Sequence, residues 1–301
     1  MSDDRGAVVV VGSVNLDLVL RSRSLPQAGE TVADATIVEA LGGKGANQAL
    51  AAARMGTPVA LVACVGDDPA GRAALQALQR EAIDTSRCRM VSEPTGRAAV
   101  LVDHEGRNAI SVGPGANALL APEDLAGPWP QQTRLLLTQL EISAEAESAA
   151  IGLARSRGVS TCLNATPADR LHSVTETPDM LVVNRTEAEA LGGGTGSAGR
   201  LAKALSLRLG IKTVVVTDGD RGAALQSGSE LIVEEAHPVT VRDSTGAGDA
   251  FAGVLVASLA EGVAVGVALR RACVAGALAC TAAGASPAIP SRRQVLAAAV
   301  S

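Results

Sequence analysis

The feature that most constrains the fold of this 301-residue chain is a repeated alternation of short apolar runs and helix-like segments. Residues 7–11 (A-V-V-V-V) end at Gly12, as a buried strand would. Residues 45–55 (G-A-N-Q-A-L-A-A-A-R-M) predict a helix that stops at Gly56. Because parallel strands are joined by crossover helices, repetition of this order predicts an α/β fold: a central, mainly parallel sheet with helices on both faces.

Further elements follow the same order along the chain. We expect strands at 59–65, 135–141, 159–164, 180–184 and 213–217, helices at 69–82, 144–157, 186–191 and 198–208, a hairpin-like region at 223–241 and a helical C-terminal part. Extended segments at 14–20, 31–40, 97–103 and 108–112 interrupt the alternation. They predict a small separate sheet, within 14–40 and 97–112, that acts as a lid on a single domain spanning 1–301.

Charge and composition argue against polymeric or membrane partners. The formal net charge is −5 and no Lys/Arg-rich run is present, so neither nucleic acid nor a membrane surface is expected as a partner. Phe251 and Trp129 are the only aromatic residues, which leaves little on which bases could stack. Glu261 and Arg270–Arg271 divide the apolar part at 251–285 into pieces too short to span a bilayer.

Cysteine usage and the N-terminus predict a cytoplasmic protein. The five cysteines form no C-x-x-C pair, and their apolar neighbours indicate free, buried thiols in a reducing compartment. The acidic start M-S-D-D-R-G runs directly into a strand and does not look like a secretory leader. The three histidines are scattered and indicate no zinc site.

The stretch D-S-T-G-A-G-D-A-F at 243–251 has two interpretations. One is a helix start, because Asp, Ser and Thr are preferred caps and Asp249 in a first turn suits the helix dipole. The other is an anion site at that helix N-terminus, with a catalytic carboxylate aimed at it. The remaining motifs decide between them.

A second glycine stretch, G-G-K-G-A-N at 42–47, opens the first helix. Paired glycines let a ligand approach the backbone, and Lys44 and Asn47 can donate hydrogen bonds. Asn15 and Asp17 lie on one face of an otherwise apolar strand, where a buried carboxylate needs partners. A polyhydroxylated ligand would supply them.

The match to G-x-G-x-x-G at 194–199 carries less weight. It follows the helix-like stretch E-A-E-A-L, whereas a dinucleotide site needs strand, turn and helix in that order. We interpret it as a loop. An oxidoreductase that uses these glycines is the disfavoured alternative from another class of protein.

Three motifs in order carry a resemblance to a known family: V-G-S-V-N-L-D, G-G-K-G-A-N-Q-A and D-S-T-G-A-G-D-A-F. Together they resemble the ribokinase family of sugar kinases, the phosphofructokinase-B type. Further matches cover essentially the whole chain: V-G-D-D-P-A-G at 65–71, P-T-G-R-A at 94–98, P-G-A-N at 114–117, L-E at 140–141, N-R-T-E at 184–187, T-D-G-D-R-G at 217–222 and A-A-G-A-S-P at 282–287. The resemblance implies ATP-dependent phosphorylation of a sugar, with D-ribose at O5 the first expectation.

The resemblance also assigns roles to individual residues. Asp249 matches the catalytic base, and the amides of Gly246, Ala247 and Gly248 match the anion hole for the γ-phosphate. The sugar-binding positions are Asn15, Asp17, Gly43, Lys44, Asn47, Glu141 and Asp249, and the nucleotide-binding positions are Asn184, Thr217, Gly219, Gly222, Gly248 and Cys273. Asn184 and Glu187 would hold Mg²⁺ through water.

An activating monovalent cation, K⁺, is expected beside Asp243 and Thr245. Backbone oxygens of Ala279, Ala282 and Gly284 would complete this site, and Ala288 stands where ribokinases often carry a serine hydroxyl. A second departure is Arg185, where the family more often has an acid. Arg185 lies either near the nucleotide phosphates or, as we favour, in solvent.

Other acceptors and another class of protein stay open. Deoxyribose, a different pentose or hexose, and a nucleoside are alternative substrates, the nucleoside being disfavoured because aromatic residues are scarce. A sugar-sensing protein without catalysis is disfavoured because Asp249 and the glycine loop are present. By resemblance alone, pairing of the lid strands predicts a homodimer.

Overall fold

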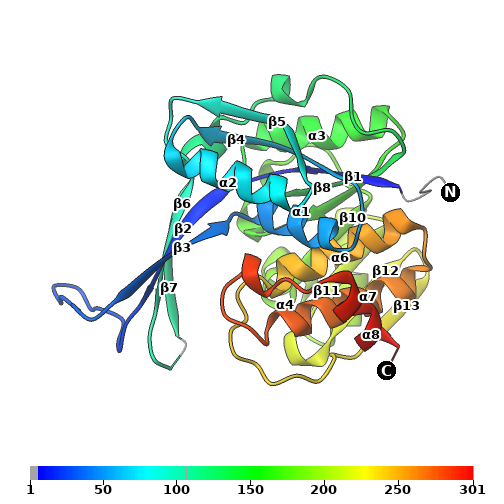
Figure 1. The fold of residues 1–301 in the computed structure, drawn as a ribbon. Helices are drawn as coiled ribbons and strands as arrows, with labels where there is room; N and C mark the ends of the chain where they lie inside the picture. The colour runs from blue at the N-terminus through cyan, green and yellow to red at the C-terminus, as the bar shows by residue number, and fades with distance from the viewer. Residues whose placement is uncertain (1–5, 106, 301) are drawn as a thin grey trace.

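A nine-stranded sheet forms the centre of the protein, whose computed structural model describes residues 6–105 and 107–300 (Figure 1). Across the sheet the strands are β13 (Glu230–Glu234), β12 (Ala223–Ser227), β11 (Thr213–Thr217), β10 (Met180–Asn184), β9 (Ser160–Asn164), β8 (Thr133–Gln139), β1 (Ala7–Val11), β4 (Val59–Gly66) and β5 (Asp84–Val91). Neighbours from β11 to β5 pair in parallel, and the β11–β12–β13 edge is antiparallel. The predicted mainly parallel α/β sheet is confirmed. The acidic stretch at 1–5 lies outside the described residues.

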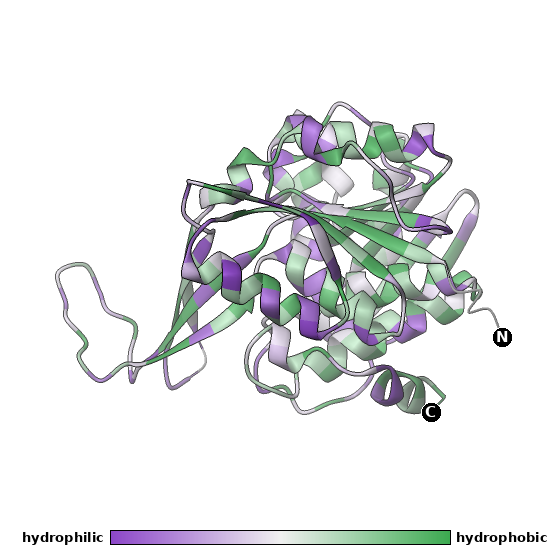
Figure 2. Cartoon of the chain, turned by 45° about the horizontal axis from the view of Figure 1, so that its top comes forward, coloured by the Kyte–Doolittle hydropathy of each residue, from purple (hydrophilic) through white to green (hydrophobic). Residues whose placement is uncertain are grey.

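Helices cover both faces of this sheet because its strands are apolar on both sides. Val8 and Val10 of β1 pack in one core cluster, and Val9 and Val11 in another on the opposite face. The first face carries α1 (Lys44–Arg54), α2 (Pro69–Arg80), α6 (Ala247–Glu261), α7 (Val265–Ala279) and α8 (Arg292–Ala299). The second carries α3 (Ala144–Ser156), α4 (Arg185–Ala188) and α5 (Ala198–Leu209). In Figure 2 the central strands are accordingly hydrophobic and the polar residues lie mainly on outer surfaces.

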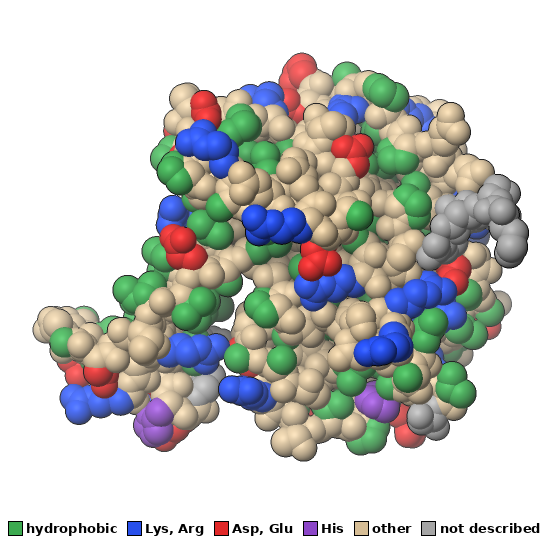
Figure 3. All heavy atoms as spheres, viewed as in Figure 1, with side chains coloured by type: hydrophobic (Ala, Val, Ile, Leu, Met, Phe, Trp, Pro, Cys, Tyr) green, Lys and Arg blue, Asp and Glu red, His purple; other side chains and the backbone are tan. Residues whose placement is uncertain are grey.

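The predicted small separate sheet is also confirmed. Its order is β3 (Thr36–Gly42), β2 (Asn15–Arg21), β6 (Arg97–Val102) and β7 (Asn108–Gly113), with β2 and β6 parallel and the other two pairs antiparallel. This small sheet projects from the body (Figure 1), and a notch separates the two in Figure 3. Ile37, Val38 and Ile110 on it are more than half exposed.

Several predicted boundaries were wrong. The strand expected at 31–40 begins at Thr36, and the edge strand β5 was missed because its polar sequence D-T-S-R-C-R-M-V lacks an apolar run. The helix expected at 186–191 is a single α turn followed by a π turn at Glu189–Gly193. Gly192 there adopts φ 82°, which lies outside the right-handed helical region, so the helix cannot continue past it. Among the described residues no helix is long and apolar enough to cross a membrane.

Candidate active site

The predicted site residues follow the carboxyl ends of neighbouring parallel strands, where α/β folds bind ligands. Glu141 lies two residues after β8, Asn184 ends β10 and Thr217 ends β11. Asn184 and Thr217 are register partners across the β10–β11 pair. Glu141 and Thr217 therefore lie along the same edge of the sheet, although they are far apart in sequence.

Asn15 and Asp17 lie at the base of the small sheet. Asn15 is buried, and its Oδ1 accepts a hydrogen bond from Asn117 Nδ2 at 2.8 Å. Asp17 Oδ1 accepts from the Ala98 amide at 3.1 Å. A side chain at Gly42 would lie 2.0 Å from Asp17 Oδ2, so the glycine is what leaves room for this carboxylate. Burial, reinforced by the Glu141 charge and opposed by the Ala98 and Asn15 hydrogen bonds, raises the pKa of Asp17 to about 6.

The start of α1 binds the loop after β8. Gly43 caps the helix at φ 85°, and a side chain there would lie 2.8 Å from the Ser13 carbonyl. The Lys44 amide donates to Glu141 Oε2 at 3.1 Å, and the Ser13 hydroxyl donates to the same oxygen. The charge of Asp249, ahead of those of Glu141 and Glu187, raises the pKa of Lys44 despite its burial. The Lys44 ammonium therefore carries its charge among these acids.

Asp249 is buried in the first turn of α6, with 6% of its surface exposed. Both carboxylate oxygens accept hydrogen bonds from α1: Oδ2 from Asn47 Nδ2 at 3.0 Å, and Oδ1 from Gln48 Nε2 at 3.0 Å. The two amide donors fix the orientation of the carboxylate at the start of α6. Such a group can accept a proton from a neighbouring hydroxyl group.

The N-terminus of α6 has one fewer free amide than the sequence predicted. Gly246 caps the helix in the left-handed conformation at φ 78°, with no side-chain cap. The Ala247 amide, expected in the anion hole, donates to the Ser244 carbonyl at 3.2 Å. At Gly248 an added side chain would meet nothing within 4 Å, so this turn faces open space. The helix dipole and the Gly248 amide remain available to an anion.

A cavity of about 480 Å³ opens beside this helix start. Five of the six predicted nucleotide positions line it, all except Asn184: Thr217, Gly219, Gly222, Gly248 and Cys273. Phe251 and the extended segment 236–241, which sequence reasoning did not assign to the site, line it as well. Burial raises the pKa of the Cys273 thiol to about 12, so this cysteine offers a packing surface and no thiolate.

The N-R-T-E motif forms a closed polar cluster beside this cavity. Asn184 and Glu187 cap α4 reciprocally: Asn184 Oδ1 accepts from the Glu187 amide at 2.8 Å, and Glu187 Oε2 accepts from the Asn184 amide at 2.8 Å. No group of three His, Cys, Asp or Glu side chains suited to direct metal binding occurs in the described ranges. The two side chains fit Mg²⁺ held through water better than a direct coordination shell.

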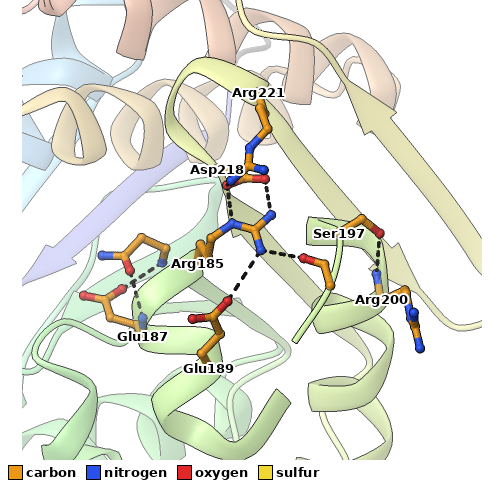
Figure 4. Close-up of polar contacts among 9 residues, drawn as sticks. Arg185, Glu187, Glu189, Ser197, Arg200, Asp218 and Arg221 are labelled. Carbon is orange, nitrogen blue, oxygen red and sulfur yellow. Dashed lines mark hydrogen bonds and ion pairs between the residues drawn. The ribbon is translucent and has the colours of Figure 1, made fainter. Parts of the chain in front are cut away.

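The preference for Arg185 in solvent was wrong. Its guanidinium forms a two-pronged ion pair with Asp218, and it also donates to the Gly196 carbonyl (Figure 4). Arg221 donates to Asp218 at 3.2 Å from the other side. The Arg185 hydrogen bonds, which outweigh the effect of burial, keep the pKa of Asp218 below its ordinary value. Arg185 therefore joins the end of β10 to the loop after β11, and the 194–199 glycines form a loop that it binds.

Asp243 organises the loop expected to hold a monovalent cation. Its Oδ1 accepts from the Thr245 amide at 3.0 Å and hydroxyl at 2.6 Å, and its Oδ2 accepts from the Gly284 amide at 2.8 Å. Burial alone would raise the pKa of Asp243, but these bonds and the Arg21 charge, 3.7 Å away, lower it. Ala288 is buried and brings no hydroxyl. The Asp243 carboxylate and the Thr245 hydroxyl are hard oxygen donors of the kind that an alkali cation takes, and Arg21 is a competing positive charge.

Comparison with known proteins identifies the family. The model of the pfkB family carbohydrate kinases matches residues 6–292. The chain belongs to this family. It is 35% identical to the ribokinase of Haemophilus influenzae over 299 residues, covering 97% of this chain and 98% of that protein. It is 31% identical to the deoxyribokinase of Salmonella typhimurium, covering 95% and 96%. The structure of Arabidopsis thaliana ribokinase complexed with ribose and ATP superposes with a TM-score of 0.86 at 30% identity, covering 98% and 99%.

This carbohydrate kinase carries site residues that its sequence motifs did not single out. Ser13 binds Glu141, Asn117 binds Asn15, and Gln48 binds Asp249. Ser13, Asn117 and Gln48 all lie inside the family motifs, at positions that were assigned no role of their own. Their burial as polar residues was the available signal, because a buried polar group requires a partner.

Proposed function

We propose that this chain phosphorylates D-ribose at O5 with ATP, giving ribose 5-phosphate and ADP. The observation that carries the proposal is the buried Asp249 carboxylate, held at 3.0 Å by Asn47 and by Gln48 at the start of a helix. It lies between polar residues suited to a sugar and a cavity suited to a nucleoside. Similarity to ribokinases over nearly the whole chain supports ribose and ATP as the substrates.

The sugar would be held where the small sheet joins the body. Asp17 and Glu141 accept hydrogen bonds from hydroxyl groups, while Asn15 and Asn47 both donate and accept. Gly43 lets the backbone of Ser13 and Asn15 pack against the start of α1, which brings Asn15 and Lys44 to the same site. The Lys44 ammonium lies among the acids there. The small sheet would exclude water from the transferred group as a lid does.

In the chemical step Asp249 takes the proton of the sugar O5 hydroxyl. The O5–Pγ bond forms as the bond between Pγ and the β,γ-bridging oxygen breaks, and ADP leaves with that electron pair. The Gly246–Gly248 turn, the α6 dipole and Lys44 would offset the charge on the transferred phosphoryl group. General-base assistance of this kind is typically worth about 10²–10⁴ in rate.

The nucleoside of ATP would fill the cavity lined by Thr217, Gly219, Gly222 and Cys273. Asn184 and Glu187 would bind the waters of Mg²⁺, which neutralises phosphate charge when bound. Asp243 and Thr245 would bind K⁺ behind the α6 turn, together with carbonyls of Ala279, Ala282 and Gly284. Without a hydroxyl at Ala288 we expect weak binding there.

We further propose a cytoplasmic homodimer. The described cysteines are all free thiols, which fits a reducing compartment. The exposed apolar residues of the small sheet, Ile37, Val38, Ile110 and Val112, would be covered by the same sheet of a second copy.

Deoxyribose is the second candidate, because a deoxyribokinase is 31% identical to this chain. Coupled measurement of ADP release over ribose, deoxyribose, fructose and adenosine, each with K⁺ or Na⁺, tests the assignment. We expect the highest kcat/KM with ribose and modest stimulation by K⁺ over Na⁺. A higher kcat/KM with deoxyribose would replace the proposed substrate, and release with none of the sugars would refute the proposal.

A further inference from the structure

Three buried amide side chains and one partly buried threonine lie behind Asp249 and contact neither substrate in the reaction proposed above. Gln139 and Gln48 are completely buried, and Asn164 is 8% exposed. Gln139 and Asn164 are register partners on the neighbouring strands β8 and β9, and Gln48 reaches them from α1. Thr166 follows Asn164 at the end of β9. We call these four residues the polar relay.

Hydrogen bonds join the polar relay to Asp249 at one end and to Glu187 at the other. Gln139 Nε2 donates to Gln48 Oε1 at 2.9 Å. Gln48 Nε2 donates to Asp249 Oδ1 at 3.0 Å and to Asn164 Oδ1 at 2.9 Å. Asn164 Nδ2 donates to Thr166 Oγ1 at 3.4 Å, and Thr166 Oγ1 donates to Glu187 Oε1 at 2.7 Å. A continuous chain therefore runs from Asp249 to Glu187.

The direction of every bond in this chain follows from its two acidic ends. An ionised carboxylate only accepts, so Gln48 must present its amide nitrogen to Asp249. That nitrogen has two protons, and the second goes to the Asn164 oxygen. Because the Asn164 oxygen is taken by Gln48, Asn164 meets Thr166 with its amide nitrogen and donates to the Thr166 hydroxyl oxygen. The hydroxyl proton of Thr166 is then free to be donated to Glu187. The arrangement is self-consistent when Asp249 and Glu187 are both ionised.

Stability alone does not explain the polar relay. It lies against the apolar core between α1, α6 and the sheet, where buried polar groups cost free energy unless all are paired. Within the described part of the chain, the buried oxygen Gln139 Oε1 has no hydrogen-bond partner. An apolar filling would avoid that cost, so a requirement other than stability maintains these residues.

We propose that Gln48 and Asn164 are positioning residues that hold the Asp249 carboxylate in its accepting form and in fixed relation to Glu187. The inference rests on the proposed roles of Asp249 as base and of Glu187 at the Mg²⁺-nucleotide end. The base is thereby coupled to the phosphate-binding end through side chains that contact neither substrate.

The test uses two substitutions that keep size and remove donors. Gln48→Met should lower kcat about 10- to 100-fold, the range expected for losing one hydrogen bond to a charged group. The acid limb of kcat against pH should move to higher pH, because a carboxylate with one donor fewer is protonated more easily. The sugar KM should change less than about threefold.

Thr166→Val should instead raise the KM for Mg²⁺-ATP several-fold while leaving the sugar KM unchanged. With both substitutions together, the losses in kcat/KM for ATP should be less than additive, because either change alone interrupts the same chain.

Matched controls are Gln226→Met, a buried glutamine that binds Gly228, and Thr161→Val, a buried threonine on β9 that binds Asp179. Both controls should alter the melting temperature and leave the pH profile unchanged.

Gln48→Glu serves if the Met variant does not fold, since it keeps the shape and can share one proton with Asp249. The acid limb of its kcat profile should move further than that of Gln48→Met, because a second acid lies beside the first. A wild-type pH profile in a folded Gln48 variant, or fully additive losses, would overturn the inference. These measurements use the sugar that the wild-type enzyme phosphorylates. If the proposed function fails, the wild type itself is inactive, whereas if this inference fails, the wild type is active and the Gln48 variant behaves like it.

Discussion

Replacing Glu147 on α3 by glutamine should make the protein less sensitive to alkaline pH. Glu147 is 1% exposed, and neither of its oxygens has a hydrogen-bond partner among the described residues. The Thr138 hydroxyl nearby donates to the Val11 carbonyl at 2.9 Å and so has no proton for Glu147. Burial raises the pKa of Glu147 from 4.5 to about 8, and the charge of Arg170 acts in the opposite direction.

The sign of the effect follows from linkage. Between pH 4.5 and 8 the folded chain keeps a proton that the unfolded chain has released, so stability falls by about 1.4 kcal/mol for each pH unit. From pH 5 to pH 8 this amounts to roughly 4 kcal/mol, and the loss levels off above the folded pKa. Below pH 4.5 Glu147 is protonated in the folded and in the unfolded chain alike, so its ionisation no longer affects stability.

Urea unfolding of wild type and Glu147→Gln at pH 5, 6, 7 and 8 measures this contribution. A glutamine cannot ionise, so its advantage in unfolding free energy should grow with pH, whatever constant offset the new amide brings. Glu145→Gln, an exposed position on the same helix, is the control and should show no such trend. A difference between Glu147→Gln and wild type that does not change with pH would refute the reasoning.

Two further outcomes are expected. Asp17 has a pKa of about 6 and accepts most strongly from sugar hydroxyls when ionised, so kcat/KM for the sugar should fall as pH falls from 7 to 5. Asp17→Asn should flatten this profile and raise the sugar KM about tenfold or more. An effect confined to the KM for ATP would contradict the assignment. Arg185→Gln should raise the KM for ATP and lower the melting temperature, because Asp218 is left largely buried without its main cation. Adding Asp218→Asn should recover part of the lost melting temperature. Arg155→Gln, which breaks an exposed ion pair with Glu176, is the control, and equal effects of Arg155→Gln and Arg185→Gln would contradict this prediction.

The central sheet was predictable because strands buried on both faces appear as continuous apolar runs. Runs such as 7–11 and 214–216 have few other ways to bury every side chain. The edge strand β5 was not predictable in this way, since an edge lies partly in solvent and takes polar residues. The motif glycines indicated the site because glycine marks close approach and positive φ, as Gly43 and Gly246 show.

The sequence motifs could not predict which side chains from distant segments would contact one another. Arg185 meets Asp218 because Asn184 and Thr217 are register partners, so the residues that follow them lie side by side. Gln48 meets Asn164, 116 positions away in sequence, for a similar reason: α1 packs where β8 and β9 end. Strand order and register have to be known before such partners can be inferred, and periodicity within a segment contains neither.

The measurement that tests the account most directly compares wild type with Asp249→Asn for ribose binding and for ribose-dependent ADP release. Asparagine keeps the shape and an oxygen for Asn47 or Gln48, but it cannot take the proton from O5. We predict that calorimetry finds ribose binding within about threefold of wild type while turnover falls by about 10²–10⁴. Turnover within about tenfold of wild type would contradict the assignment of Asp249 as the base.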